Sequence, residues 1–142
     1  MWLCDTNILC DKHLLGEHVE MHMFLGTLKK GIKVNGYLRN NLFEPSLLFT
    51  RHSELAIEMK ERGFNHNSGL STLEFMQEFS KLGDDIKWHE INRQKAFNDL
   101  LTRCPMCFAR YLKIINAKLD IVKDTISYKQ MMKLVEPPSE SV

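Results

Sequence analysis

Helix start and stop signals divide this chain into segments of helical length, and no alternation typical of a β-strand persists between them. Asp11 is a suitable N-cap for a first helix that we expect over about residues 11–30, where Gly31 follows. A second long helix is expected over residues 45–62, because it opens on a proline and is followed by Gly63. The pattern predicts an all-α fold.

The second half of the chain carries signals of the same kind. Ser71 and Glu74 match the capping box S-x-x-E, in which the serine accepts a hydrogen bond from the backbone N–H of the glutamate. Asp84 or Asp85 is expected to cap a further helix, which Cys104-Pro105 interrupts. The expected elements are a loop at 65–70, helices at 72–82, 86–103 and 106–119, an amphipathic segment near 125–135 and a disordered polar tail at 136–142. We expect the helices to cross and not to form a regular four-helix bundle.

Length, composition and charge limit the class of protein. A chain of 142 residues with a hydrophobic fraction of 44% fits one domain with its own core. No apolar run approaches the roughly 18 residues of a membrane span, and the N-terminus lacks the basic region of a signal peptide. We therefore expect a cytoplasmic protein whose four cysteines are reduced thiols. A net charge of +1 does not indicate a generally basic nucleic-acid-binding protein.

One segment is nevertheless basic. Residues 21–43 contain no aspartate or glutamate, and they are rich in glycine and asparagine. Two interpretations remain open, a solvated surface loop and a loop that contacts phosphate groups. The cations of the segment are Lys29, Lys30, Lys33 and Arg39.

The stretch HLLGEHVEMH, residues 13–22, concentrates ionisable groups on one helix face. At 100° per residue, His13, Glu17 and Glu20 fall within about 60° of each other, in line with Phe24. Such a stripe is typical of the wall of a polar cleft, which the N-terminal segment is long enough to reach. The alternative is an intrahelical His–Glu pair beside a solvated acid.

Histidine and cysteine pairs elsewhere allow metal binding but are not specific for it. His18 and His22 have the i, i+4 spacing of a chelating pair, yet they lie on the opposite side of the helix and are expected at the surface or facing a partner. The sequence CPMC has the C-x-x-C spacing, and a zinc site would have to combine all four cysteines. The favoured interpretation is that the cysteines are small buried hydrophobic residues. The cysteines are Cys4, Cys10, Cys104 and Cys107.

Two blocks of the sequence resemble one enzyme family. DKHLLGEHVE is similar to the first-helix motif D-x-H-L-x-x-E-x-x-E of the pyrimidine-dimer DNA glycosylases, the phage-type endonuclease V family, and ELAIEMKERGFNH resembles the family's ELxxExxxRGFN. A basic loop separates the two blocks, as in the family, and INRQKAFNDLLTRCP is a weaker third match. The resemblance covers roughly residues 1–115. It implies a compact all-α glycosylase/AP-lyase domain over 1–116 and leaves 117–142 as a partly helical C-terminal extension.

The resemblance also implies a mechanism without metal or organic cofactor. The nucleophile is the α-amine of the N-terminal residue, here Met1, which we expect to be retained because Trp2 is large. Glu20 matches the family's catalytic glutamate, while His13 and Glu17 match the other polar residues of the motif. An α-amine has a reference pKa of about 7.7–8.0, against about 10.4 for lysine, so a useful fraction is unprotonated at neutral pH. It can attack C1′ of a nucleotide and form a Schiff base, after which β-elimination cuts the strand.

The expected partner is double-stranded DNA with damaged or modified bases or abasic sites, bound by a monomer in the nucleoid of a bacterial or phage-infected cell. The family's first helix carries arginines where this chain has Val19 and Met23, so the resemblance does not determine which lesion is the substrate. A different possibility is a non-catalytic helical module that binds DNA or a protein. The candidate DNA contacts are Trp2, Lys29, Lys30, Lys33, Arg39, Arg51, His52 and Arg62.

Overall fold

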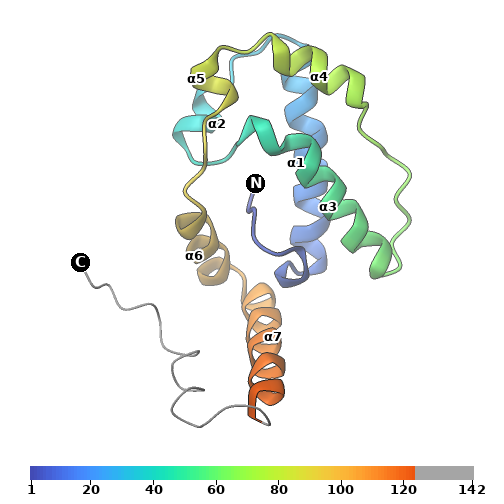
Figure 1. The fold of residues 1–142 in the computed structure, drawn as a ribbon, viewed down its shortest axis with the longest axis vertical. Coiled ribbons are helices and arrows are strands. Elements are labelled where there is room, and N and C mark those ends of the chain that lie inside the picture. The colour runs from blue at the N-terminus through green and yellow to red at the C-terminus, as the bar shows by residue number, and fades with distance from the viewer. Residues whose placement is uncertain (124–142) are drawn as a thin grey trace, which may run out of the picture.

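The computed structural model describes residues 1–123, and within that range it contains helices and no strands (Figure 1). The expected all-α fold is confirmed. In chain order the elements are η1 (Thr6–Ile8), α1 (Asp11–Lys29), α2 (Asn35–Arg39), η2 (Pro45–Leu47), α3 (Leu48–Glu61), α4 (Thr72–Ser80), α5 (Asp84–Lys87), α6 (Arg93–Arg103) and α7 (Pro105–Lys123).

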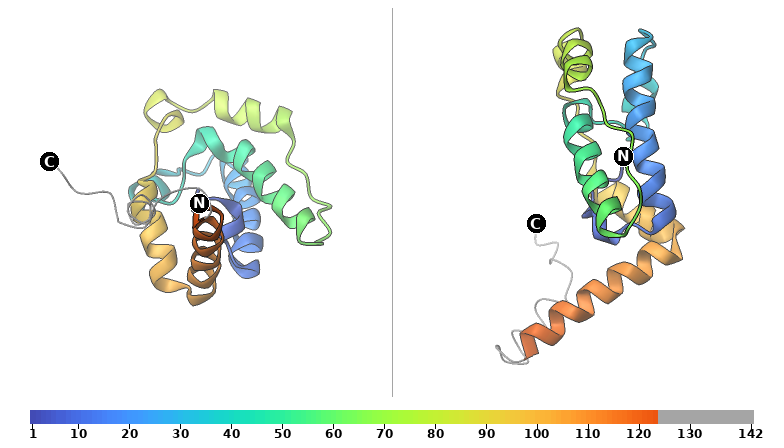
Figure 2. Two further views of the ribbon diagram at one scale, coloured as in Figure 1. Left: turned by 60° about the horizontal axis from the view of Figure 1, so that its bottom comes forward. Right: turned by 90° about the vertical axis from the view of Figure 1, so that its right-hand side faces the viewer.

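The core lies mainly between α1 and α3, which run side by side through the molecule (Figures 1 and 2). Leu14 of α1 and Leu55 of α3 are fully buried there. Phe24 stacks on Phe43 with ring centroids 4.1 Å apart, which closes the core toward the α2–η2 loop. Burial of such large apolar side chains contributes roughly 1.5–3 kcal/mol each, so this pair of helices is the stable base on which the N-terminal segment rests.

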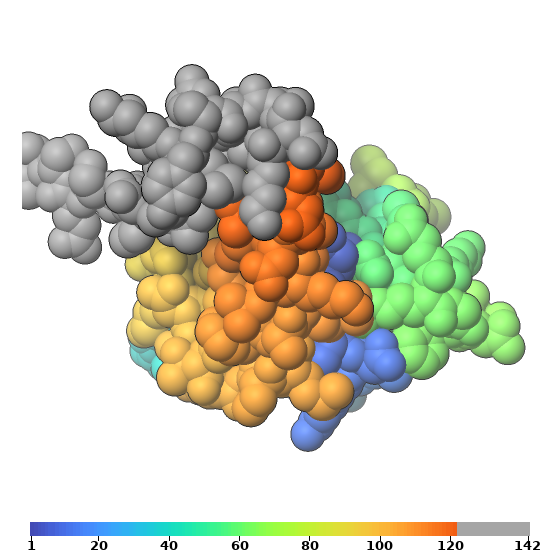
Figure 3. Space-filling view, turned by 90° about the horizontal axis from the view of Figure 1, so that it is seen from below, coloured from blue at the N-terminus to red at the C-terminus, as the bar shows by residue number. Residues whose placement is uncertain are grey.

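The N-terminal segment, residues 1–10, is enclosed by helices from both halves of the chain. Its helix η1 packs against α3 and α7, and its first residue lies between α1 and α6 (Figure 1). Beyond that contact α7 projects from the rest of the fold as an arm (Figure 2). Seen from below, α7 covers this end of the molecule with α6 beside it (Figure 3). The start of the chain is therefore an interior element.

Local signals predicted most helix limits. The first helix is confirmed, but its N-cap is Cys10 and not the expected Asp11, which is the first helical residue. The helix after Pro45 is confirmed as well, although it begins with the 3₁₀ turn η2. Ser71 caps α4 by accepting a hydrogen bond from the Glu74 N–H. The prediction of one helix over 86–103 is wrong: α5 ends at Lys87, and α6 begins only after Asn92, whose side chain accepts from the Lys95 N–H. Asn92 is a preferred N-cap residue that starts a new helix there.

The basic segment and the C-terminal part of the chain also differ from the expected pattern. The basic segment contains the short helix α2, and α7 runs without a break through the expected boundary at residues 116–117. The amphipathic segment near 125–135 and the tail at 136–142 lie outside the described residues. In the part of the chain that the structure covers, no helix combines the length and the apolar character needed to cross a membrane.

Candidate active site

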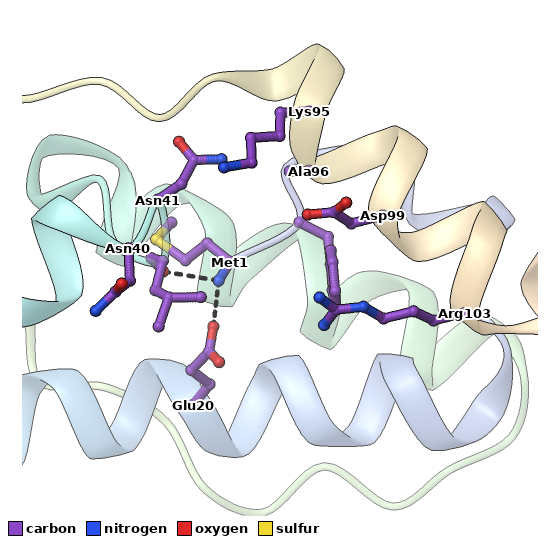
Figure 4. Close-up of a pocket in the computed structure, with 10 residues that line it drawn as sticks. Met1, Glu20, Asn40, Asn41, Lys95, Ala96, Asp99 and Arg103 are labelled. Atoms are coloured by element: carbon purple, nitrogen blue, oxygen red, sulfur yellow. Dashed lines mark hydrogen bonds and ion pairs between the residues drawn. The ribbon is translucent and has the colours of Figure 1, made fainter.

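The α-amine of Met1 lies against the carboxylate of Glu20, to which it donates a hydrogen bond (Figure 4). It also donates to the carbonyl oxygen of Leu42 at 2.9 Å. Glu20 projects from the middle of α1, and Leu42 belongs to the loop before η2. The amine of the first residue and the expected catalytic glutamate are thus in direct contact.

The side chain of Met1 and the residues that follow it hold this amine in place. The methionine is 4% exposed, and its Sδ accepts from the Glu44 N–H at 3.3 Å. Further along, the carbonyl of Cys4 accepts from Arg51 at 2.8 Å, and that of Thr6 accepts from Arg62 at 3.1 Å. The two arginines thus bind backbone carbonyls of the N-terminal segment, one before η1 and one at its first residue.

A cavity of about 360 Å³ opens beside the amine. One side is formed by Met1 and Glu20, and the other side by residues of α6 (Figure 4). Trp2 also lines the cavity. A volume of this order accommodates a small ligand or one extruded nucleotide in part. The remaining lining residues are Asn40, Asn41, Leu42, Lys95, Ala96, Asp99 and Arg103.

The environment of Glu20 favours its protonated form more than water does. Burial raises the pKa of this carboxyl above its usual value, and the negative charge of Glu17 acts in the same direction, while the adjacent amine of Met1 partly opposes both. A carboxyl with a raised pKa can take up and return a proton near neutral pH more readily than an exposed one.

Glu17 lies on the same helix but has a different partner. Its oxygens accept from Nε and Nη2 of Arg51 at 2.6 and 3.1 Å, and both side chains are buried. Neither residue is among those that line the cavity. Arg51, an expected phosphate contact, is 3% exposed and is occupied by Glu17, Glu54 and the Cys4 carbonyl. In this structure the pair joins α1 to α3.

His13 is likewise not among the residues that line the cavity. Its Nδ1 lies 3.2 Å from Sγ of Cys10 and 3.5 Å from Sγ of Cys107, and its ring meets the edge of Trp2 at a centroid distance of 5.9 Å. Cys104 completes the group. The weak zinc alternative named Cys4, but Cys4 is not part of this cluster, and burial raises the pKa of its thiol to about 11.

The expectation of a surface pair at His18 and His22 is wrong for His18, which is 5% exposed. Nε2 of His18 lies 2.9 Å from Nε2 of His66, and Nε2 of His22 lies 3.2 Å from Nε2 of His52. His52, an expected DNA contact, is 4% exposed in this cluster. The loop that follows α3 folds back over α1 and brings the four rings together.

The expected phosphate contacts are scattered over the surface. Lys30, Lys33 and Arg39 are exposed, and Lys29 is also exposed but pairs with Glu74 at 3.2 Å. Arg62 is largely enclosed by Asp11, Glu58 and the Thr6 carbonyl. Lys95 and Arg103 lie on the cavity wall but were not predicted from the sequence, because only the approach of α6 to the N-terminus places them there.

The comparison with protein families decides the assignment. The family model for pyrimidine dimer DNA glycosylases matches residues 1–72, half of the chain, and this part contains both the amine and Glu20. The chain belongs to the pyrimidine dimer DNA glycosylase family. Membership indicates a DNA glycosylase, an enzyme of DNA repair whose partner is DNA. No curated protein and no solved structure gives a significant match.

Proposed function

We propose that this glycosylase is also an AP lyase that uses the α-amine of Met1 as its nucleophile and Glu20 as its acid–base group. The observation that carries the proposal is the contact between these two groups at the edge of the cavity. An amine beside a carboxylate, with room for a sugar next to both, is the arrangement that the reaction requires.

The chemical steps follow from the two groups. The unprotonated amine attacks C1′, and the bond from C1′ to the base breaks with its electron pair leaving on the base. One amine proton moves by way of Glu20 to the ring oxygen O4′, the C1′–O4′ bond breaks, and a protonated imine results. The imine makes a C2′ proton acidic, and its removal expels the 3′ phosphate. The carboxylate also stabilises the positive charge that develops on the sugar.

The wall opposite the amine supplies groups suited to DNA. Lys95 and Arg103 are exposed cations on α6, and Asp99 lies between them along the helix (Figure 4). Cations at a cavity mouth contact the phosphates that flank an extruded nucleotide. We propose that these two residues, with the exposed Lys30, Lys33 and Arg39, bind the DNA backbone, while the lesion is a damaged or modified pyrimidine or an abasic site.

The test is borohydride trapping of the protein, with its N-terminus confirmed free, on duplexes that carry an abasic site or a cyclobutane dimer. We expect a covalent adduct that maps to the Met1 nitrogen. Glu20→Gln should slow trapping by roughly 100-fold or more while leaving the fold intact, because the amide retains an oxygen that accepts from the amine. Glu61→Gln, at the exposed end of α3, is the matched control and should trap at the normal rate.

A second comparison addresses the nucleophile directly. One glycine added before Met1 moves the terminal amine by up to about 3.5 Å and should abolish trapping. A tag at the C-terminus should not. If the extended protein traps normally, the nucleophile is a different group. If neither duplex gives an adduct, the lyase proposal fails, and gel-shift measurements then test the alternative of a DNA-binding module without catalysis.

A further inference from the structure

Three cysteines and one histidine from opposite ends of the described chain meet at one point. Their ligand atoms all lie within 4.8 Å of one another, and the group consists of Cys10, His13, Cys104 and Cys107. All three cysteines are buried free thiols. Packing alone does not require the ring nitrogen of a histidine to face three sulfurs, because a buried thiol is satisfied by apolar neighbours.

We propose that these four residues bind a structural zinc ion. Zinc favours four tetrahedral ligands drawn from cysteine sulfur and histidine nitrogen. With Zn–S and Zn–N bonds of about 2.3 and 2.0–2.1 Å, a tetrahedron places two sulfurs about 3.8 Å apart and a sulfur and a nitrogen about 3.5 Å apart.

Three of the six distances between these ligand atoms lie close to those of that tetrahedron. Sγ of Cys10 and Sγ of Cys104 are 3.8 Å apart, a separation that is also far too long for a disulfide. Nδ1 of His13 is 3.2 Å from Sγ of Cys10 and 3.5 Å from Sγ of Cys107. The spacings in sequence, C-x-x-H and C-x-x-C, are those of zinc-binding pairs.

The surrounding backbone supports negatively charged sulfur. Sγ of Cys107 accepts from the Cys10 N–H at 3.2 Å, and Sγ of Cys104 accepts from the Cys107 N–H at 3.4 Å. Cys10 is the N-cap of α1, and Cys107 lies in the first turn of α7. Two helix N-termini thus converge on the cluster, and backbone N–H groups from both face its sulfurs.

The site ties together the two sides of the cavity. His13 contacts Trp2, which lines the cavity, and Cys104 directly follows Arg103, which lines it from α6. A zinc ion here would hold α1, α6 and α7 in a fixed relation. This inference concerns metal binding and stands independently of the proposed reaction.

The experiment begins with the full chain, prepared without added chelator and dialysed against metal-free buffer. We expect about one equivalent of zinc by elemental analysis and a Zn–S distance of about 2.3 Å by X-ray absorption. Replacement by Co²⁺ should give the intense sulfur-to-cobalt charge-transfer absorption. These measurements use the unaltered protein and so do not depend on whether a variant folds.

Variants then identify the ligands. Cys104→Ser and Cys107→Ser should lose the metal and the cobalt absorption, whereas Cys4→Ser should keep both, because Cys4 lies outside the cluster. His52→Ala removes a ring from the separate histidine cluster and should also leave the sulfur signal unchanged. The proposal is overturned if the protein binds no metal, if its cobalt spectrum shows no sulfur ligand, or if His52→Ala alone removes the ion.

Discussion

Replacing Glu17 by glutamine should leave the positive charge of Arg51 buried without its main counter-charge. The two side chains are 0% and 3% exposed and share two hydrogen bonds, of 2.6 and 3.1 Å. After the change the guanidinium retains the Cys4 carbonyl and Glu54, which is 51% exposed and therefore well solvated. Removing one member of a buried pair costs about 3–5 kcal/mol, a large part of the roughly 5–15 kcal/mol that stabilises a domain.

Thermal and urea denaturation followed by circular dichroism measure this cost. For a domain of this size the expected loss corresponds to a fall in Tm of about 10–20 °C. Glu54→Gln is the matched control, since it touches the same guanidinium from the surface and should cost less than about 1 kcal/mol. Glu17→Leu combined with Arg51→Met should recover much of the stability, because neither charge is then buried.

Two results would refute the reasoning. A Tm for Glu17→Gln within about 3 °C of the unaltered protein would show that the pair does not hold α1 to α3. A loss of borohydride trapping far larger than the loss of folded protein, measured well below the Tm, would show that Glu17 acts in the chemistry as the sequence motif suggested.

Two further predictions concern the histidine cluster and the rim of the cavity. Burial and the neighbouring histidines lower the pKa values of His18 and His52 from 6.5 to about 4. Between these two pH values the unfolded chain therefore binds more protons than the folded one. The stability that these neutral histidines contribute should therefore be fully present above about pH 6.5 and should fall as the pH drops toward 4. A urea midpoint that does not change over this range would contradict the lowered pKa values. Asn41 has a φ of +60° and exchanges hydrogen bonds of 2.6 and 3.0 Å with the backbone of Asn92. Asn41→Ala should cost about 2–4 kcal/mol in urea denaturation, and Asn41→Gly should recover the conformational part of that loss.

Helix limits could be predicted because they depend on a few neighbouring residues. Pro45 and Ser71 act within one turn of their own position, and the structure confirms the helices that they start. The first helix also begins where it was expected, although Cys10 and not Asp11 is its N-cap. The signal at Asn92 is equally local, but it lies inside a stretch whose composition suits a continuous helix. One long helix was predicted there, although Asn92 was available as the N-cap of a separate helix.

The stripe on α1 shows what periodicity cannot provide. The sequence placed His13, Glu17 and Glu20 on one face, and the family resemblance treated them as one site. In the structure, Glu20 meets the amine, Glu17 meets Arg51, and His13 meets the cysteines. Seven residues of helix separate the ends of the stripe by about 10 Å along the axis, so residues on one face still contact different neighbours.

Contacts between residues far apart in the chain could not be predicted from local sequence patterns. Cys10 and Cys107 are 97 positions apart, and nothing local indicates that they meet, or that His13 replaces Cys4 beside them. The C-x-x-H spacing of residues 10–13 was the one signal that could have led to this set. Arg51 was taken for a surface cation because charged residues are seldom buried unless they are paired, and its partner lies 34 positions away.

The cavity draws its two sides from parts of the chain that lie far apart in the sequence. The amine and Glu20 belong to the part that the family model matches, residues 1–72, while Lys95, Asp99 and Arg103 lie beyond it. Substitutions in α6 can therefore reshape the far wall of the cavity without touching the amine or Glu20. Under the proposed mechanism, the shape of the cavity and the amine–carboxylate pair beside it can thus be varied separately, because they come from different helices.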